Sequence, residues 1–218
     1  MVEIFCKEIN NIGFFWYIYF VVKNTEAAFH WIIDILENKG IRYKISGGFA
    51  ARMHGVSREL ADIDIEIADE DILKITGDVE PYIVFGPARF RDESWDLKLM
   101  TLNYLVQEID IAGNEALMYD RSHSVWERCS NGLEDAELME VFHRKVWIES
   151  PDSLIRYKTK LGREVDIEDV RQLKAIQEII TLVVFAIFSM FYLGETLRWN
   201  HLVGFALLVA AAFFIFRK

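Results

Sequence analysis

The chain has 218 residues, enough for one ordinary domain together with a small additional element. Acidic residues outnumber basic residues by 34 to 24, and the formal net charge of −10 argues against a broad nucleic-acid-binding surface. Apolar residues make up 52% of the chain but are unevenly distributed, because only Glu195 and Arg198 are charged between Ile179 and Phe216. The composition therefore predicts a globular part followed by an apolar tail.

The first 24 residues form an apolar N-terminal extension. Its aromatic run, Ile12 to Val22, is too short to cross a bilayer as a helix. Glu3 and Glu8 offset Lys7, so the basic start of a signal peptide is missing, and no small-residue cleavage site follows. We expect a buried or interfacial segment here.

The next stretch alternates helical and strand patterns. Thr25 to Lys39 has apolar residues at helical spacing, with Thr25 as the expected cap and Gly40 as a left-handed end. The elements expected after it are a strand at 41–45, a helix at 49–54, a strand at 61–68 and a helix at 69–76 capped by Asp69.

The remainder of the globular part is expected to be rich in strands. The expected strands lie at 81–86, 95–104, 106–112, 115–119 and 141–148, and helices at 153–161 and 167–176 follow them. Ser150 and Pro151 are typical of a helix start, since serine caps the first turn and proline is tolerated within it.

Three acids mark the strand at 61–68. Asp62, Asp64 and Glu66 alternate with isoleucines, so the acids share one face of the strand. Carboxylates clustered on one face repel each other unless a cation lies between them, and Mg²⁺ prefers oxygen ligands of this kind. Asp110 and Glu108 share a face of the strand at 106–112, so Glu108 is a rival for any role given to Asp110.

A glycine pair precedes the acidic strand. Gly47 and Gly48 follow Ser46 and open a short helix, so the backbone there can approach a phosphate group closely. Ser46 is either a phosphate-contacting hydroxyl or a turn former. A phosphate cradle beside metal-binding carboxylates points to phosphoryl or nucleotidyl transfer.

The ordered set of motifs over residues 25–173 resembles the nucleotidyltransferase superfamily with the DNA polymerase β-like fold. The likeness is to its minimal and toxin-type members. It rests on Gly47-Gly48, on Asp62-Ile63-Asp64 and on Ile109-Asp110-Ile111. Arg58 just before the acids also fits, as does the later segment YKTKLGREVDIEDV, which contains Lys158, Asp166 and Asp169. We expect Asp166 and Asp169 to be structural.

The resemblance implies an α/β (α+β) fold, with a mixed sheet flanked by helices and followed by an apolar helical hairpin. It also implies that Asp62, Asp64 and Asp110 are catalytic and bind two Mg²⁺ ions. Ser46, Gly47, Gly48, Arg58 and Lys158 would then bind the nucleoside triphosphate. For Arg58, pairing with Asp62 or Glu59 is the structural alternative.

The tail, residues 174–218, contains two apolar runs at 179–194 and 202–216. Each approaches the length of a bilayer-spanning helix when neighbouring residues are included, and a buried hairpin of a soluble fold is the alternative. From residue 172 onward the chain is similar to the C-terminal half of small four-span, drug/metabolite transporter-like membrane proteins. A natural fusion, a gene-model artefact and an artificial chimera all account for such a join.

Two functions follow as expectations. The first is a metal-dependent nucleotidyltransferase that moves a nucleoside monophosphate from a triphosphate to a hydroxyl of a protein, an RNA or a small molecule. Its catalytic domain would be cytoplasmic and anchored to the inner face of the membrane through residues 179–216, with an antitoxin as a further expected partner. The second is a non-catalytic module that senses nucleotides or associates with a membrane.

Overall fold

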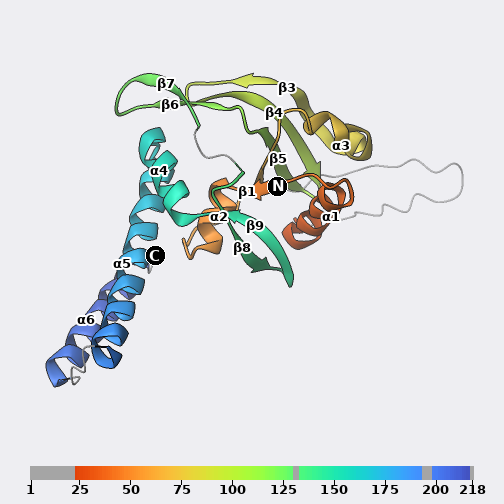
Figure 1. Cartoon of the computed structure of the whole chain (residues 1–218). Helices are drawn as coiled ribbons and strands as arrows, with labels where there is room; N and C mark the ends of the chain where they lie inside the picture. The colour runs from red at the N-terminus through yellow and green to blue at the C-terminus, as the bar shows by residue number, and fades with distance from the viewer. Residues whose placement is uncertain (1–22, 130–132, 193–197, 217–218) are drawn as a thin grey trace, which may run out of the picture.

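The computed structural model describes residues 23–129, 133–192 and 198–216. The expected N-terminal extension therefore lies almost entirely outside the described residues, as do residues 195–197 at the start of the expected link between the two apolar runs. A mixed sheet forms the centre of the globular body, α1 and α3 lie on one side of it, and α4 and α5 lie on the other (Figure 1). This confirms the α/β fold class.

The sheet joins nine strands. Its order is β7-β6-β4-β5-β2-β1-β9-β8, and β3 pairs with β4 outside this path. The strands are β1 (Tyr43–Ile45), β2 (Asp62–Ile67), β3 (Ile83–Arg91), β4 (Trp95–Tyr104), β5 (Gln107–Gly113), β6 (Leu117–Asp120), β7 (Val125–Arg128), β8 (Ala136–Val141) and β9 (Arg144–Glu149). Most neighbours are antiparallel, but β2 pairs with β5 and β1 pairs with β9 in parallel.

The helices before and between the first strands are α1 (Thr25–Asn38), α2 (Gly47–Met53) and α3 (Ile72–Val79), and a short 3-10 turn (Glu80–Tyr82) follows α3. Helix α1 buries Ala28, Phe29, Ile32, Ile33 and Leu36 in the core. The isoleucines of β2 and β5 are likewise fully buried, while the acids between them are only partly buried. The alternation predicted for the acidic strand is confirmed.

Two expected helix caps were wrong. The side chain that caps α1 is Asn24, which accepts a hydrogen bond from the Ala27 amide, whereas Thr25 donates to Gln107 on β5. Helix α3 begins after Asp71, two residues later than expected from Asp69. The Asp69 carboxylate instead accepts the Glu115 amide at 3.0 Å. Both side chains are used by tertiary contacts that local patterns do not encode.

The C-terminal third begins with α4 (Pro151–Leu161), capped as expected by Ser150. Helix α5 (Glu164–Phe191) then runs without interruption through the expected boundary at residues 173 and 174, and α6 (Trp199–Phe216) follows. The lower parts of α5 and α6 project away from the sheet (Figure 1). Helix α5 is continuous across residues 173 and 174, so no break in the chain marks a domain boundary there. A division of the chain at residue 173 stays a prediction.

Candidate active site

The parallel pairing of β2 with β5 brings the predicted acids together. In the register of these strands Asp62 lies beside Glu108, and Asp64 lies beside Asp110. Ligand oxygens of Asp62, Glu108 and Asp110 all lie within 4.8 Å of one another, which is a spacing that one cation could bridge. Glu108 therefore belongs to the cluster together with Asp110, and the same-face spacing of the two residues was the signal for it.

Asp64 points toward the glycine turn. Its Oδ2 accepts a hydrogen bond from the Gly48 amide at 3.2 Å. Burial, together with the charges of Asp62 and Asp110, raises the pKa of Asp64 to about 7, although the Gly48 hydrogen bond and Lys158 act in the lowering direction. At pH 8 this carboxyl group is an anion close to the carboxylates of Asp62 and Asp110, and a bound cation would relieve their repulsion.

Asp110 is held from the neighbouring strand. The Thr101 hydroxyl on β4 donates to Asp110 Oδ1 at 2.6 Å. Burial nevertheless raises the pKa of Asp110 to about 6, and the nearby charges of Glu108 and Asp62 act in the same direction. These residues fit a divalent metal, because the donors are hard oxygens and their mutual repulsion is otherwise uncompensated.

Gly47 and Gly48 are required by the packing of the turn. Gly47 has φ +62°, and a Cβ there would lie 1.8 Å from Asp64 Oδ2. A Cβ on Gly48 would lie 1.6 Å from a guanidinium nitrogen of Arg58. Ser46 precedes the first turn of α2, but its hydroxyl does not cap that helix. The turn therefore brings backbone, carboxylate and guanidinium into direct contact.

Arg58 pairs with neither Asp62 nor Glu59 among the ion pairs of the described residues. Its Nε lies 3.7 Å from Asp169 Oδ1 on α5. This pair differs from both structural alternatives drawn from the sequence, because it joins residues more than a hundred positions apart. Arg58 is thus held over the glycine turn from the α5 side.

Lys158 lies in a buried ion-pair network. Its ammonium is 3.1 Å from Asp166 Oδ1 and 3.0 Å from Asp169 Oδ2, and its side chain is 2% exposed. Arg163 also pairs with Asp166, at 2.6 Å. The expectation that Asp166 and Asp169 are structural fits these contacts. A direct contact between Lys158 and a nucleotide stays a prediction.

A second buried cluster lies farther along the same face of the sheet. Lys44 on β1 is fully buried between Glu66, at 3.3 Å, and Glu149, at 3.5 Å. Burial raises the pKa of Glu66 to about 7, although Lys44 opposes this shift. Glu149 also accepts the hydroxyl of Ser153. Glu66 is therefore bound to Lys44, and Asp62, Asp64, Glu108 and Asp110 are the acids of these two strands that no lysine pairs with in this way.

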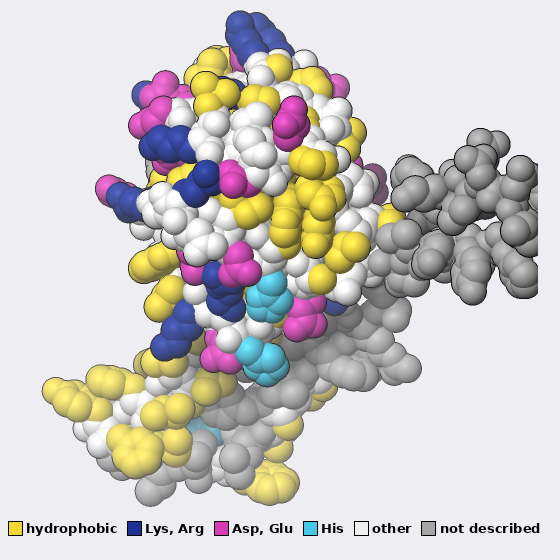
Figure 2. Space-filling model, turned by 90° about the vertical axis from the view of Figure 1, so that its right-hand side faces the viewer, with side chains coloured by type: hydrophobic (Ala, Val, Ile, Leu, Met, Phe, Trp, Pro, Cys, Tyr) yellow, Lys and Arg dark blue, Asp and Glu magenta, His cyan; other side chains and the backbone are white. Residues whose placement is uncertain are grey.

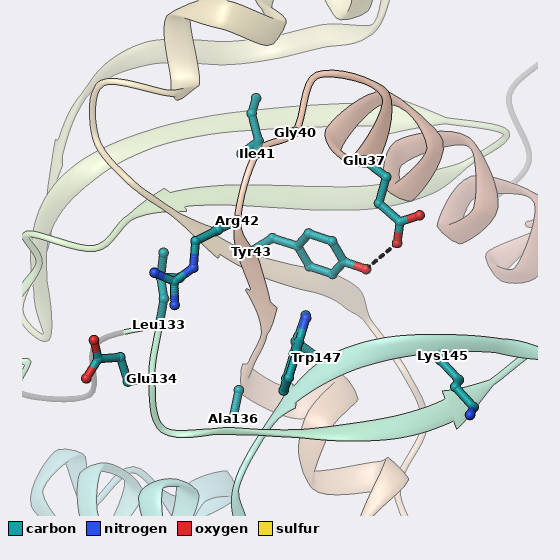
Figure 3. A pocket seen from close by; sticks show the side chains of 10 residues that line it. All are labelled: Glu37, Gly40, Ile41, Arg42, Tyr43, Leu133, Glu134, Ala136, Lys145 and Trp147. Atoms are coloured by element: carbon teal, nitrogen blue, oxygen red, sulfur yellow. Dashed lines mark hydrogen bonds between the residues drawn. The ribbon is translucent and has the colours of Figure 1, made fainter.

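A separate cleft of about 650 Å³ lies between the end of α1, the start of β1 and the β8–β9 hairpin. Figure 3 shows Tyr43 and Trp147 in its walls, with the Tyr43 hydroxyl donating to Glu37. None of the acids on β2 or β5 lines it. This cleft is consequently distinct from the candidate active site.

Solved structures resemble the globular part. A "putative nucleotidyltransferase" from Thermotoga maritima aligns with a TM-score of 0.55 and 20% identity, covering 67% of this chain and 89% of the other. The chain has a nucleotidyltransferase fold. The lincomycin-bound lincosamide antibiotic adenylyltransferase LnuA aligns at 0.48 and 20% identity, covering 70% and 98%. The antibiotic-resistance factor ANT(2'')-Ia aligns at 0.45 and 14% identity, covering 74% and 94%.

The tail matches a different family. Residues 157–216 match the family described as "Putative member of DMT superfamily (DUF486)". The match begins within α4, so it overlaps the end of the globular part. No curated protein matches the sequence. Among the described residues, one helix, α5, is both long enough and apolar enough to cross a membrane.

Proposed function

We propose that this protein is a metal-dependent nucleotidyltransferase. The observation that carries the proposal is the parallel pairing of β2 and β5, which sets Asp62 and Asp64 beside Glu108 and Asp110. The fold shared with the Thermotoga maritima protein supports it. In the reaction, a hydroxyl oxygen of the acceptor attacks the α-phosphorus of a nucleoside triphosphate. The bond from that phosphorus to the bridging oxygen breaks, and pyrophosphate leaves.

The chain's own residues have defined roles in this proposal. Asp62, Asp64 and Asp110 would hold Mg²⁺, which when bound supplies positive charge to the phosphate oxygens, and Glu108 is close enough to share this role. Asp110 lies in the same acidic cluster and, as a carboxylate, would accept the proton of the attacking hydroxyl. The backbone of Gly47 and Gly48, the Ser46 hydroxyl and the Arg58 guanidinium would bind the triphosphate, with Lys158 behind them.

Turnover with labelled triphosphates tests this proposal. The full-length protein is incubated with Mg²⁺ and each of ATP, GTP, CTP and UTP, and candidate protein, RNA and small-molecule acceptors are scanned for the mass of an added nucleotide. Asp62→Asn should reduce pyrophosphate release at least about a thousandfold, because it removes a carboxylate from the centre of charge stabilisation. Equal release by wild type and Asp62→Asn would contradict the assignment.

Calorimetry separates catalysis from nucleotide sensing. Metal-dependent binding of a non-hydrolysable triphosphate without any turnover would favour the non-catalytic alternative. Absence of metal-dependent binding would contradict both the nucleotidyltransferase proposal and the nucleotide-sensing alternative. An antitoxin partner remains an expectation from the resemblance alone, and co-purification with products of neighbouring genes would test it.

We further propose that the tail associates with a membrane. Side chains of α5 such as Val184, Phe185 and Phe191 are 59%, 62% and 86% exposed, and hydrophobic side chains gather on the part that projects below the body (Figure 2). Apolar surface of this extent is typical of a membrane or protein interface. The family match over residues 157–216 supports association with a membrane rather than with a protein partner. Basic residues flank the tail, which would place both flanks and the catalytic domain on the cytoplasmic side.

Carbonate extraction of membranes tests this second proposal. The full chain should stay in the pellet, whereas a peripheral protein would be released. Release of all of the protein by carbonate would contradict insertion. The apolar helices would then need a protein partner.

A further inference from the structure

One face of α5 contacts the loop that carries Arg58. The Ser57 amide donates to Gln172 Oε1 at 2.9 Å, and Arg58 Nε lies 3.7 Å from Asp169 Oδ1. At Gly55 a Cβ would come within 3.1 Å of Ile176 Cδ1. Residues 169, 172 and 176 are spaced so that they share one helix face. The loop is therefore held at three successive points along α5.

Two of these contacts involve buried polar side chains, and the one between Arg58 and Asp169 is charged. Asp169 and Gln172 are 1% and 2% exposed. Asp169 is further fixed by Lys158, so its carboxylate has little freedom to follow a moving Arg58. From the other side, Arg52 of α2 donates to the Arg58 carbonyl at 2.5 Å. The backbone and the side chain of Arg58 are thus fixed by two different helices.

The place where Arg58 is held is the glycine turn. Its guanidinium lies directly against Gly48, whose amide donates to Asp64. A guanidinium in this position presents several donors to an anion that approaches the turn. Its Nε is buried and makes no hydrogen bond within the described structure, so its alignment depends on the longer ion pair with Asp169.

We propose that Asp169 and Gln172 are positioning residues that hold Arg58 in place for the triphosphate. This inference rests on the nucleotidyltransferase proposal. It adds that the nucleotide site is completed by α5, the same helix that continues into the apolar tail. Neither residue touches the substrate. Each acts by fixing the loop at residues 55–58, one through charge and the other through a backbone hydrogen bond.

The test uses binding of a non-hydrolysable triphosphate with Mg²⁺ to the full-length protein. Asp169→Asn keeps the shape of the side chain and removes its charge, and Gln172→Ala removes the acceptor for Ser57. Each should weaken binding about tenfold, the loss expected when one charge-assisted hydrogen bond is misplaced. Lys174→Ala, on the exposed side of the same helix, is the matched control.

Hydrogen exchange supplies a readout that does not depend on nucleotide. The Ser57 amide should exchange faster in Gln172→Ala and at the wild-type rate in Lys174→Ala. If Arg58→Ala weakens binding while folded Asp169→Asn and Gln172→Ala bind like wild type, the positioning role is refuted. If the wild-type protein binds no triphosphate, the proposed function fails and this role fails with it. Ser57 exchange would then still report whether α5 holds the loop.

Discussion

Replacing Asp64 by asparagine should stabilise the metal-free protein at alkaline pH. Asparagine has nearly the same shape, and its amide oxygen can still accept the Gly48 amide that now reaches Asp64 Oδ2 at 3.2 Å. The substitution removes a negative charge that lies among the carboxylates of Asp62 and Asp110. The variant therefore tests whether the site is electrostatically strained without a cation.

The magnitude follows from the pKa of Asp64. Its ordinary value of 3.8 is raised to about 7 in the folded protein, and each pKa unit corresponds to about 1.36 kcal/mol. Full ionisation would thus destabilise the folded protein by about 4 kcal/mol. Because the side chain retains some contact with water, we expect about half of this, roughly 2 kcal/mol, to be recovered by Asp64→Asn.

The sign of the pH dependence is fixed by the direction of the shift. A carboxyl group with a raised folded pKa binds its proton more tightly when folded, so its contribution to stability is fully present below about pH 3.8 and is lost as pH rises through about 7. The advantage of Asp64→Asn should therefore grow between pH 4 and pH 7 and then level off. Glu66 titrates in a similar range, but it is present in both proteins and cancels in the difference.

Urea unfolding of the full chain in mild detergent with a chelator measures the effect. Fluorescence of Trp31 and Trp95, which pack against the core, reports on the globular part. The difference in unfolding free energy between variant and wild type is followed from pH 4 to pH 8. A difference that is flat with pH, or a variant less stable than wild type at pH 8, would refute the claim that the acids repel each other across β2 and β5.

Three further predictions concern the same site. Gly47→Ala should lower the free energy of unfolding in urea by several kcal/mol, because the added methyl group would overlap Asp64. The control is Gly40→Ala, at a similar φ of +64° with nothing within 4 Å of the added methyl group, which should lose only about 1 kcal/mol. Equal losses would contradict the steric argument. Calorimetric Mg²⁺ affinity should fall as pH is lowered through about 7 and about 6, because protons compete at Asp64 and Asp110, and a pH-independent affinity would argue against these ligands. Thr101→Val removes a hydrogen bond that lowers the Asp110 pKa, so the acidic limb of the activity profile should move upward by about one pH unit.

Much of the fold was predictable because its signals are local. The alternation of acids and isoleucines in β2 has the period of a strand, and the helix start at Ser150 and Pro151 depends only on neighbouring residues. The apolar residues at helical spacing in α1 were predictable for the same reason. Predictions were weaker where a side chain is used by a distant element, as with Thr25 and Asp69.

The sequence by itself determined which residues could form the site, since a strand fixes the face on which Asp62, Asp64 and Glu66 lie. Only the tertiary structure decided how they divide: Glu66 pairs with Lys44, while Glu108 joins Asp62 and Asp110. The reason is that side-chain direction along one strand is a local property, whereas the neighbour of a strand depends on packing of the whole chain. The ion pair of Arg58 with Asp169 belongs to this second class, because it joins a loop to a helix more than a hundred residues away.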